Sequence, residues 1–393
     1  MRGRPRRILV ATFGSAGDLF PILPAIFELR AQGHDVRVAT SRGLGLYLRA
    51  CGVPAIALGD GSELRVVDDA DLFSTRFGGW ASWRRTLTTY VEPGLADDVG
   101  RLESVVSSWK PDLLVTSGFA LGARIAAIRS GLAQLTCSIY PQHQAVSMAA
   151  SGHLARSCRD EVRRLAGSDA DLRSLIWGAP ADVLLHDRAL LGDDPCAARA
   201  IGFPSWDQVP VAGSDREAVD RATARTGPHV LVTLGSFVGL ARRSAWRAAA
   251  AAAGSMGATA VFVGARGAWA QEEFADRPDV RCVGFLPLSD LVSRFDATIH
   301  HGGVGTTFAV LRAGRPAIVL PQAFDQTYNA RLVSAAGVGI ESTDGDLPSA
   351  LAEVLGRRDL RDRATAVAAQ LAPTPVATAA LTNVIGRALE NAS

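Results

Sequence analysis

Short runs of apolar, often β-branched residues alternate with longer stretches of helical character along the chain. In the first half, an apolar run at residues 7–12 precedes a helical stretch at 22–32, and a second apolar run follows at 36–39. A strand, a helix and a second strand in this order form a βαβ unit, in which the two strands lie parallel. Further apolar runs extend the pattern at residues 55–58, 112–116, 132–138 and 182–185. We therefore predict a doubly wound parallel sheet for the first half.

The second half repeats this alternation and predicts a second parallel sheet. Its apolar runs lie at residues 229–234, 259–263, 280–283, 297–299 and 317–320. A chain of 393 residues is long enough for two domains, each of which buries a core of its own. The pattern and the length together predict an α/β protein with two domains.

Composition and charge exclude several classes of protein. Hydrophobic residues make up 48% of the chain and charged residues 20%, which indicates a globular chain. A formal net charge of +2 indicates neither a nucleic-acid partner nor a membrane surface. No apolar run reaches the roughly 18 residues of a membrane helix, and the N-terminal arginines lead into a strand rather than a signal-peptide core. Five cysteines without metal-site spacing suit reduced thiols and a cytoplasmic location.

A glycine-rich turn follows the apolar run at 297–299. Residues 301–307 read HGGVGTT, and residues 306–312 suit a helix that Gly314 ends. Glycines let the backbone turn tightly and approach a ligand closely. The free N–H groups and the dipole at a helix N-terminus favour an anion, typically a phosphate. His301 can donate a hydrogen bond to the same anion, so the sequence predicts a phosphate site here.

Two polar residues follow the next predicted strand. Asp325 and Gln326 come after the apolar run at 317–320. In a parallel sheet they therefore lie at the same carboxyl edge as the glycine-rich turn. A carboxylate repels a phosphate but suits hydroxyl groups just beyond it.

These residues resemble a known signature. His301 with its glycine-rich turn, Pro321-Gln322 and Asp325-Gln326 together resemble the nucleotide-sugar motif of family 1 glycosyltransferases of the GT-B fold, in the form found in bacterial enzymes that decorate natural products. The resemblance implies that His301 and the following amides hold the pyrophosphate, and that the Asp-Gln pair holds the sugar hydroxyls. The implied pyrophosphate-binding positions are Gly303, Val304, Gly305 and Thr306.

The resemblance adds two donor-binding segments. Gly235 and Ser236, after the apolar run at 229–234, correspond to a loop beside the donor phosphates. Leu286, within the GFLP sequence at 284–287, corresponds to the place where family members read the nucleobase. Because that reading uses mainly backbone groups, the sequence does not separate uracil from thymine.

Asp18 is the candidate catalytic base. Its loop, GSAGD at 14–18, lacks the second and third glycines of the dinucleotide fingerprint GxGxxG, and no acidic residue ends the second strand, which argues against a nicotinamide site. The loop resembles the acceptor-side loop of a bacterial subgroup in which Asp replaces the usual histidine base. With an unperturbed pKa of about 3.9, a carboxylate is ionised at neutral pH and can accept a hydroxyl proton. The alternative is that Asp18 caps the following helix or positions the acceptor.

The acceptor side offers weaker candidates. Many histidine-type members carry an orienting Asp where this chain has Thr116, so Asp18 has no acidic partner there. His143 lies in a loop after the run at 132–138, where it either contacts the acceptor, replaces the base or simply packs. An aromatic group between residues 60 and 94 suits the wall of an apolar acceptor site or a local packing cluster. The acceptor-binding candidates in this group are Phe73, Phe77, Trp80 and Trp83.

The resemblance implies two Rossmann-like, doubly wound parallel-sheet domains that face each other across a cleft. We expect an acceptor-binding domain at 1–205, a nucleotide-sugar domain at 206–374, and a helix at 375–393 that returns to the first domain. The implied activity is inverting transfer from a dTDP- or UDP-sugar to a hydroxyl of a small-molecule aglycone, without a metal or other cofactor. A non-catalytic auxiliary homologue and a nucleotide-sugar epimerase are the alternatives. The sequence leaves the aglycone, the sugar and the oligomeric state open.

Overall fold

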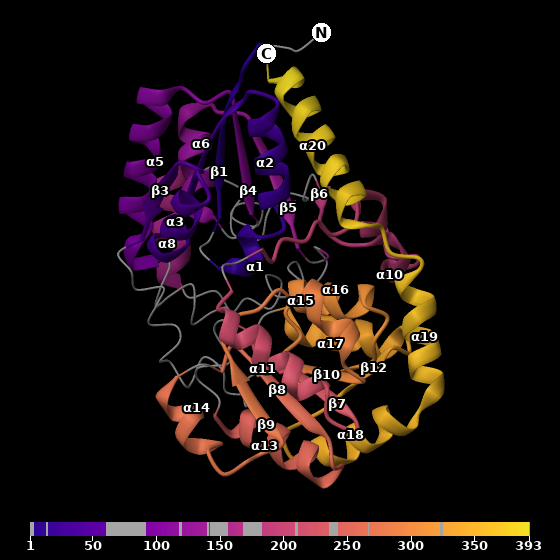
Figure 1. The fold of residues 1–393 in the computed structure, drawn as a ribbon. Coiled ribbons are helices and arrows are strands. Elements are labelled where there is room, and N and C mark those ends of the chain that lie inside the picture. The colour runs from indigo at the N-terminus through magenta and orange to yellow at the C-terminus, as the bar shows by residue number, and fades with distance from the viewer. Residues whose placement is uncertain are drawn as a thin grey trace. The chain divides into compact units, whose positions relative to one another are not determined.

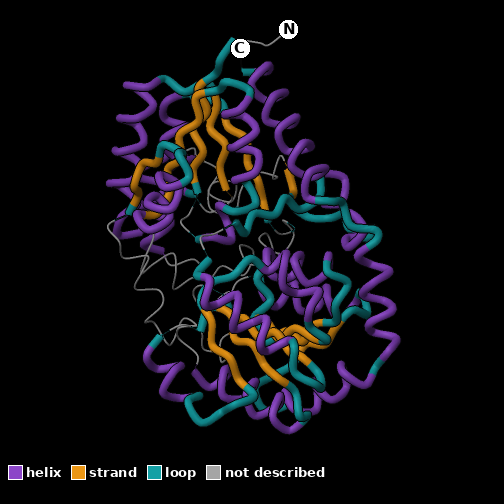
Figure 2. The backbone as a smooth tube through the Cα atoms, viewed as in Figure 1, coloured by secondary structure: helices purple, strands orange, loops and turns teal. Residues whose placement is uncertain are grey.

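The computed structural model describes residues 4–12, 15–59, 92–117, 120–139, 141, 156–167, 183–208, 211–235, 243–265, 267–322 and 325–392. Within these residues the chain forms two compact units (Figures 1 and 2). The chain leaves unit 1 after Trp206 and returns to it at Ala372, and unit 2 spans the residues between these points. No helix of the described part combines the length and the apolar character needed to cross a bilayer.

Unit 1 contains a six-stranded parallel sheet with the strand order β3-β2-β1-β4-β5-β6. In its centre, Ile8 lies opposite Val36 on one side and opposite Leu113 on the other. The chain order reverses between β1 and β4, which makes the sheet doubly wound, as predicted. The strands are β1 (Arg7–Ala11), β2 (Asp35–Ser41), β3 (Ala55–Leu58), β4 (Leu113–Ser117), β5 (Gln134–Ser138) and β6 (Val183–Leu184).

Helices flank this sheet, and the C-terminal helix joins them. On α20, Thr382 donates a hydrogen bond through its hydroxyl to Glu28 of α2 at 2.6 Å. Gly202 has φ +91°, and a Cβ atom there would lie 2.9 Å from that of Ala377, so α20 packs directly on the backbone of this segment. The helices are α1 (Ala16–Leu19), α2 (Leu23–Ala31), α3 (Arg42–Ala50), α5 (Leu95–Trp109), α6 (Leu121–Ser130), α8 (Arg156–Ala166), α10 (Arg188–Leu191) and α20 (Thr374–Asn391), with 3₁₀ turns at Glu92–Gly94 and Pro195–Arg199.

Unit 2 contains a second six-stranded parallel sheet, with the order β12-β11-β10-β7-β8-β9. The apolar runs predict five of its strands, but β12 is missed because its three residues include a glycine and a glutamate. The strands are β7 (His229–Thr233), β8 (Thr259–Val263), β9 (Val280–Val283), β10 (Ala297–His300), β11 (Ala317–Val319) and β12 (Gly339–Glu341).

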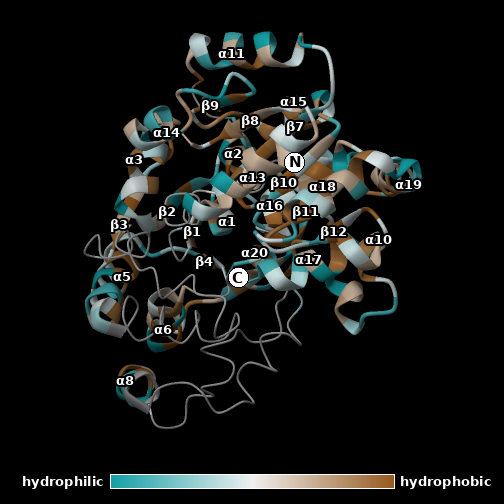
Figure 3. Ribbon diagram, turned by 90° about the horizontal axis from the view of Figure 1, so that it is seen from below, coloured by the Kyte–Doolittle hydropathy of each residue, from teal (hydrophilic) through white to brown (hydrophobic). Residues whose placement is uncertain are grey.

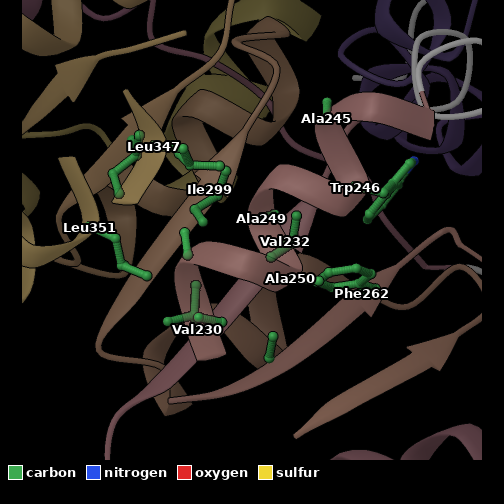
Figure 4. Close-up of a cluster of buried hydrophobic side chains, with 14 of the residues drawn as sticks. Val230, Val232, Ala245, Trp246, Ala249, Ala250, Phe262, Ile299, Leu347 and Leu351 are labelled. Carbon is green, nitrogen blue, oxygen red and sulfur yellow. The ribbon is translucent and has the colours of Figure 1, made fainter. Parts of the chain in front are cut away.

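Alanines of α13 (Arg243–Ser255) bring this helix close to the sheet of unit 2. Val230, Val232 and Ile299 of the central strands pack against alanines of α13 and leucines of α18 (Figure 4). In Figure 3, where the ribbon is coloured by hydropathy, β8 is mostly hydrophobic, whereas hydrophilic and hydrophobic residues alternate along α19. The helices are α11 (Gly213–Thr223), α13 (Arg243–Ser255), α14 (Ala268–Glu273), α15 (Leu288–Leu291), α16 (Val304–Arg312), α17 (Gln326–Ala335), α18 (Leu347–Gly356) and α19 (Arg358–Ala368), with a 3₁₀ turn at Val292–Arg294.

Candidate functional site

The carboxyl ends of the neighbouring strands β7, β10 and β11 lie next to the predicted donor residues Gly235, His301 and Asp325 in unit 2. His300, the last residue of β10, lies opposite Thr233 of β7 and Val319 of β11. Gly235 therefore follows one neighbouring strand, and the loop that leads to Asp325 follows the other. Ligands of open α/β sheets bind at this edge. The structure thus assembles at one edge residues that are far apart in the sequence.

The imidazole of His301 lies against two glycines. A Cβ atom on Gly235 would lie 2.6 Å from Nε2 of His301, and one on Gly303 would collide with the same nitrogen. Gly235 also has φ +75°, which favours glycine. Burial lowers the pKa of His301 to about 4, although an interaction with the backbone of Thr233 opposes this effect. The ring is therefore neutral at pH 7, and it remains partly accessible to solvent.

The first turn of α16 provides backbone donors beside this ring. Gly303 is the N-cap residue, and no side chain caps the helix. The N–H groups at the start of a helix have no partner within the helix, so those of Val304, Gly305 and Thr306 suit an anion. Thr307 turns away, because its hydroxyl donates to the carbonyl of Gly303 at 3.0 Å.

Asp325 and Gln326 begin α17, with Asp325 at the N-cap position. Oδ2 of Asp325 accepts a hydrogen bond from Nδ2 of Asn329 at 2.8 Å. Gln326 is 4% exposed, and its Oε1 accepts the N–H of Gln322 at 2.8 Å. The carbonyl end of the Gln326 side chain therefore binds the backbone of Gln322 in the preceding loop. The sequence alone does not reveal this contact.

Asn329 and His300 are two site residues that the sequence analysis misses. Nδ2 of Asn329 also donates to the carbonyl of Gly302 at 2.7 Å. Nδ1 of His300 accepts the N–H of Gly302 at 3.1 Å, and burial lowers the pKa of His300 to about 3. The spacing of four between Asp325 and Asn329 is the signal that could have revealed their hydrogen bond, because residues four apart share a helix face.

Leu286 follows β9, and its side chain is only 1% exposed. The N–H of the nearby Gly284 donates to the carboxylate of Asp215 at 3.3 Å. Phe285 between them is 46% exposed. At this segment a ligand would therefore meet the backbone of Leu286 rather than its side chain.

In unit 1, Asp18 lies in α1, which follows β1 at the carboxyl edge of the sheet. Ser15, not Asp18, is the N-cap residue of α1. The hydroxyl of Ser15 donates to Oδ2 of Asp18 at 2.8 Å and accepts the N–H of Asp18 at 3.2 Å. Burial raises the pKa of Asp18 to about 6, against the lowering effect of the hydrogen bonds with Ser15. The predicted base is thus a buried carboxyl that titrates near neutral pH.

One further position considered above is Thr116, which lies in β4. Thr116 is buried, and its hydroxyl donates to the carbonyl of Ser117 at 2.9 Å. The remaining candidates lie outside the described residues, namely Ser236, Phe73, Phe77, Trp80, Trp83 and His143.

Comparisons with known proteins show to which proteins the chain is similar. Residues 263–387 match the family model "Erythromycin biosynthesis protein CIII-like, C-terminal domain". The elloramycin glycosyltransferase ElmGT of Streptomyces olivaceus is 29% identical over 94% of this chain and 96% of its own length. The chain is a glycosyltransferase of the GT-B fold. It is related to glycosyltransferases of natural-product biosynthesis, as the sequence motif predicts.

Solved structures share the fold of this glycosyltransferase. The glycosyltransferase of kitacinnamycin has a TM-score of 0.73 at 20% identity and covers 98% of this chain and 100% of its own. The spinosyn rhamnosyltransferase SpnG, solved with its spinosyn aglycone, has a TM-score of 0.71 at 22% identity and covers 96% of this chain and 100% of its own. SpnG has also been solved with thymidine diphosphate, and that structure has a TM-score of 0.69 at 21% identity over 98% of this chain and 100% of its own.

Proposed function

We propose that this glycosyltransferase moves a sugar from a dTDP- or UDP-linked donor to a hydroxyl group of a natural-product aglycone and inverts the anomeric configuration. One observation carries the proposal: Asp18 is a buried carboxyl at the carboxyl edge of its sheet that accepts a hydrogen bond from Ser15, and burial raises its pKa to about 6. A general base works best when its pKa lies near the working pH. The thymidine diphosphate complex of SpnG supports a diphosphate donor, and its aglycone complex supports a small-molecule acceptor.

In the proposed reaction, the ionised carboxylate of Asp18 takes the proton of the acceptor hydroxyl. The acceptor oxygen forms a bond to the anomeric carbon as the bond between that carbon and the phosphate oxygen breaks. The electron pair of the broken bond leaves with the nucleoside diphosphate. Because this is a single displacement, the configuration at the anomeric carbon inverts.

The leaving diphosphate gains negative charge as it departs. The N–H groups at the start of α16 and a neutral His301 donate hydrogen bonds to it, and such prearranged donors contribute a few kcal/mol each to transition-state stabilisation. Asp325 and Gln326 hold the sugar hydroxyls. We propose that this set acts without a divalent metal, so that turnover is the same with and without EDTA.

Calorimetry with dTDP and UDP, with the His301→Ala variant measured in parallel, tests the donor site. We expect one nucleotide to bind, and we expect the variant to lose most of that affinity. The preferred nucleotide selects the sugars to screen with hydroxylated aglycones, and NMR coupling constants of the product give the anomeric configuration. Failure of the folded protein to bind either nucleotide would contradict the proposal and favour an auxiliary homologue.

A further inference from the structure

Gly302, which has a left-handed backbone conformation in the glycine-rich turn, forms hydrogen bonds through both its N–H and its carbonyl. Gly302 has φ +89°, a conformation that favours glycine. Its N–H donates to Nδ1 of His300, and its carbonyl accepts from Nδ2 of Asn329. A Cβ atom at this position would lie 2.9 Å from the carbonyl oxygen of Gln326. The turn therefore rests directly on the start of α17, with no room for a side chain between them.

Asn329 uses both hydrogens of one amide nitrogen. Nδ2 donates to the carbonyl of Gly302 at 2.7 Å and to Oδ2 of Asp325 at 2.8 Å. Both partners only accept hydrogen bonds, so the opposite orientation of the amide would place an oxygen against two oxygens. The side chain of Asn329 is 1% exposed, so water does not replace either bond if it is lost.

These contacts link two parts of the site with different tasks. Gly302 precedes the N-cap residue of α16 and so sets where the backbone donors of that helix lie. Asp325 is the carboxylate assigned to the sugar hydroxyls. We propose that Asn329 is a positioning residue that ties the diphosphate-binding turn to the sugar-binding carboxylate, so that the two halves of the donor site act as one unit. This inference rests on the proposed function.

The test compares the binding of a nucleoside diphosphate with that of its glucose conjugate by calorimetry. The probes are dTDP and dTDP-glucose, or UDP and UDP-glucose if the protein prefers uridine. Asn329→Ala should weaken both members of the pair about tenfold, because one buried hydrogen bond to each half of the site is lost. Asp325→Ala should weaken only the glucose conjugate. In the double variant that combines Asn329→Ala with Asp325→Ala, the fold-loss of affinity for the glucose conjugate should be smaller than the product of the two single fold-losses.

Two further variants serve as controls, one for misfolding of the alanine variant and one for a general loss of packing in α17. Asn329→Asp keeps the size of the side chain but removes both donor hydrogens, so it should show the same losses even if the alanine variant does not fold. Val333→Ala lies on the same helix, and Val333 is 1% exposed. It reduces packing without touching the hydrogen bonds, so it should bind both probes as the unmodified protein does.

The outcomes separate this inference from the proposed function. If the unmodified protein binds neither nucleotide, the proposed function fails and the inference fails with it. If it binds them and the folded Asn329 variants weaken either probe less than about twofold, only the inference is overturned. Losses for the conjugate that multiply fully in the double variant would also overturn it, because the two residues would then act independently.

Discussion

Ser15 and Asp18 hold each other through one hydroxyl group, which donates to the carboxylate at 2.8 Å and accepts the N–H of Asp18 at 3.2 Å. Burial raises the pKa of Asp18 to about 6, and these hydrogen bonds keep it from rising further. Ser15 therefore both starts α1 and keeps a share of Asp18 ionised at the pH at which a base is needed.

The first prediction concerns the pH dependence of turnover. Ser15→Ala removes the hydrogen bond to the carboxylate, so the pKa of Asp18 should rise further. The acid limb of the kcat/KM profile should move to higher pH, with activity reduced near pH 6 and largely recovered at pH 8. Ser15→Thr, which keeps the hydroxyl, is the matched control. An unshifted acid limb in the alanine variant would mean that a group other than Asp18 controls it.

Asp18→Asn should abolish most turnover, leave nucleotide affinity intact and stabilise unit 1 at neutral pH. The folded pKa of about 6 lies above the ordinary value of 3.8, so the wild-type protein loses stability as pH rises between these two values. A difference of roughly two pKa units corresponds to about 3 kcal/mol of unfolding free energy at most. The variant does not lose this free energy as pH rises, because its amide stays uncharged.

Thermal unfolding at pH 4 and pH 7.5 measures this effect. The melting temperature of Asp18→Asn should exceed that of the wild type at pH 7.5 and by less at pH 4. Asp97→Asn, at an exposed position in the first turn of α5, should show no such pH-dependent gain. An Asp18→Asn variant that is less stable than the wild type at both pH values would identify Asp18 mainly as a structural residue of α1.

The third prediction concerns the charge of His301. With its pKa lowered to about 4, His301 is neutral from pH 5.5 to 8 and acts as a hydrogen-bond donor rather than as a cation. His301→Gln keeps a neutral donor, so its nucleotide affinity should fall less than that of His301→Ala. Calorimetry across this pH range should give parallel curves for the wild type and the glutamine variant. A histidine-dependent gain in affinity toward pH 5.5 would show that the ring is charged when the nucleotide is bound.

The two sheets could be predicted because their central strands are buried on both faces and so form continuous apolar runs. β12 could not, because a three-residue edge strand with a glycine and a glutamate lacks that signal and depends on pairing with β11. His301 and Asp325 could be named as candidates because one family motif with fixed spacing contains both. The contact between Asn329 and Gly302 depends on where α17 meets the turn, and neither the apolar pattern nor the motif includes Asn329.

The last prediction compares Gly235 with Gly257, which differ in the space available to a Cβ atom. Gly235 and Gly257 both have positive φ, +75° and +61°, so an alanine at either position carries a similar backbone strain of about 1–2 kcal/mol. A Cβ atom at Gly235 would lie 2.6 Å from Nε2 of His301, whereas one at Gly257 has open space around it. Gly235→Ala should therefore displace the imidazole and weaken nucleotide binding at least as much as His301→Ala does.

Gly257→Ala should destabilise unit 2 to a similar degree and leave that affinity unchanged. Calorimetry gives the affinities, and thermal unfolding confirms that the two variants carry comparable strain. In the double variant, Gly235→Ala with His301→Ala, the loss should not exceed that of Gly235→Ala alone, because the displaced ring is already absent. Equal affinities in the two glycine variants would show that the ring of His301 moves aside without cost, and would remove Gly235 from the donor site.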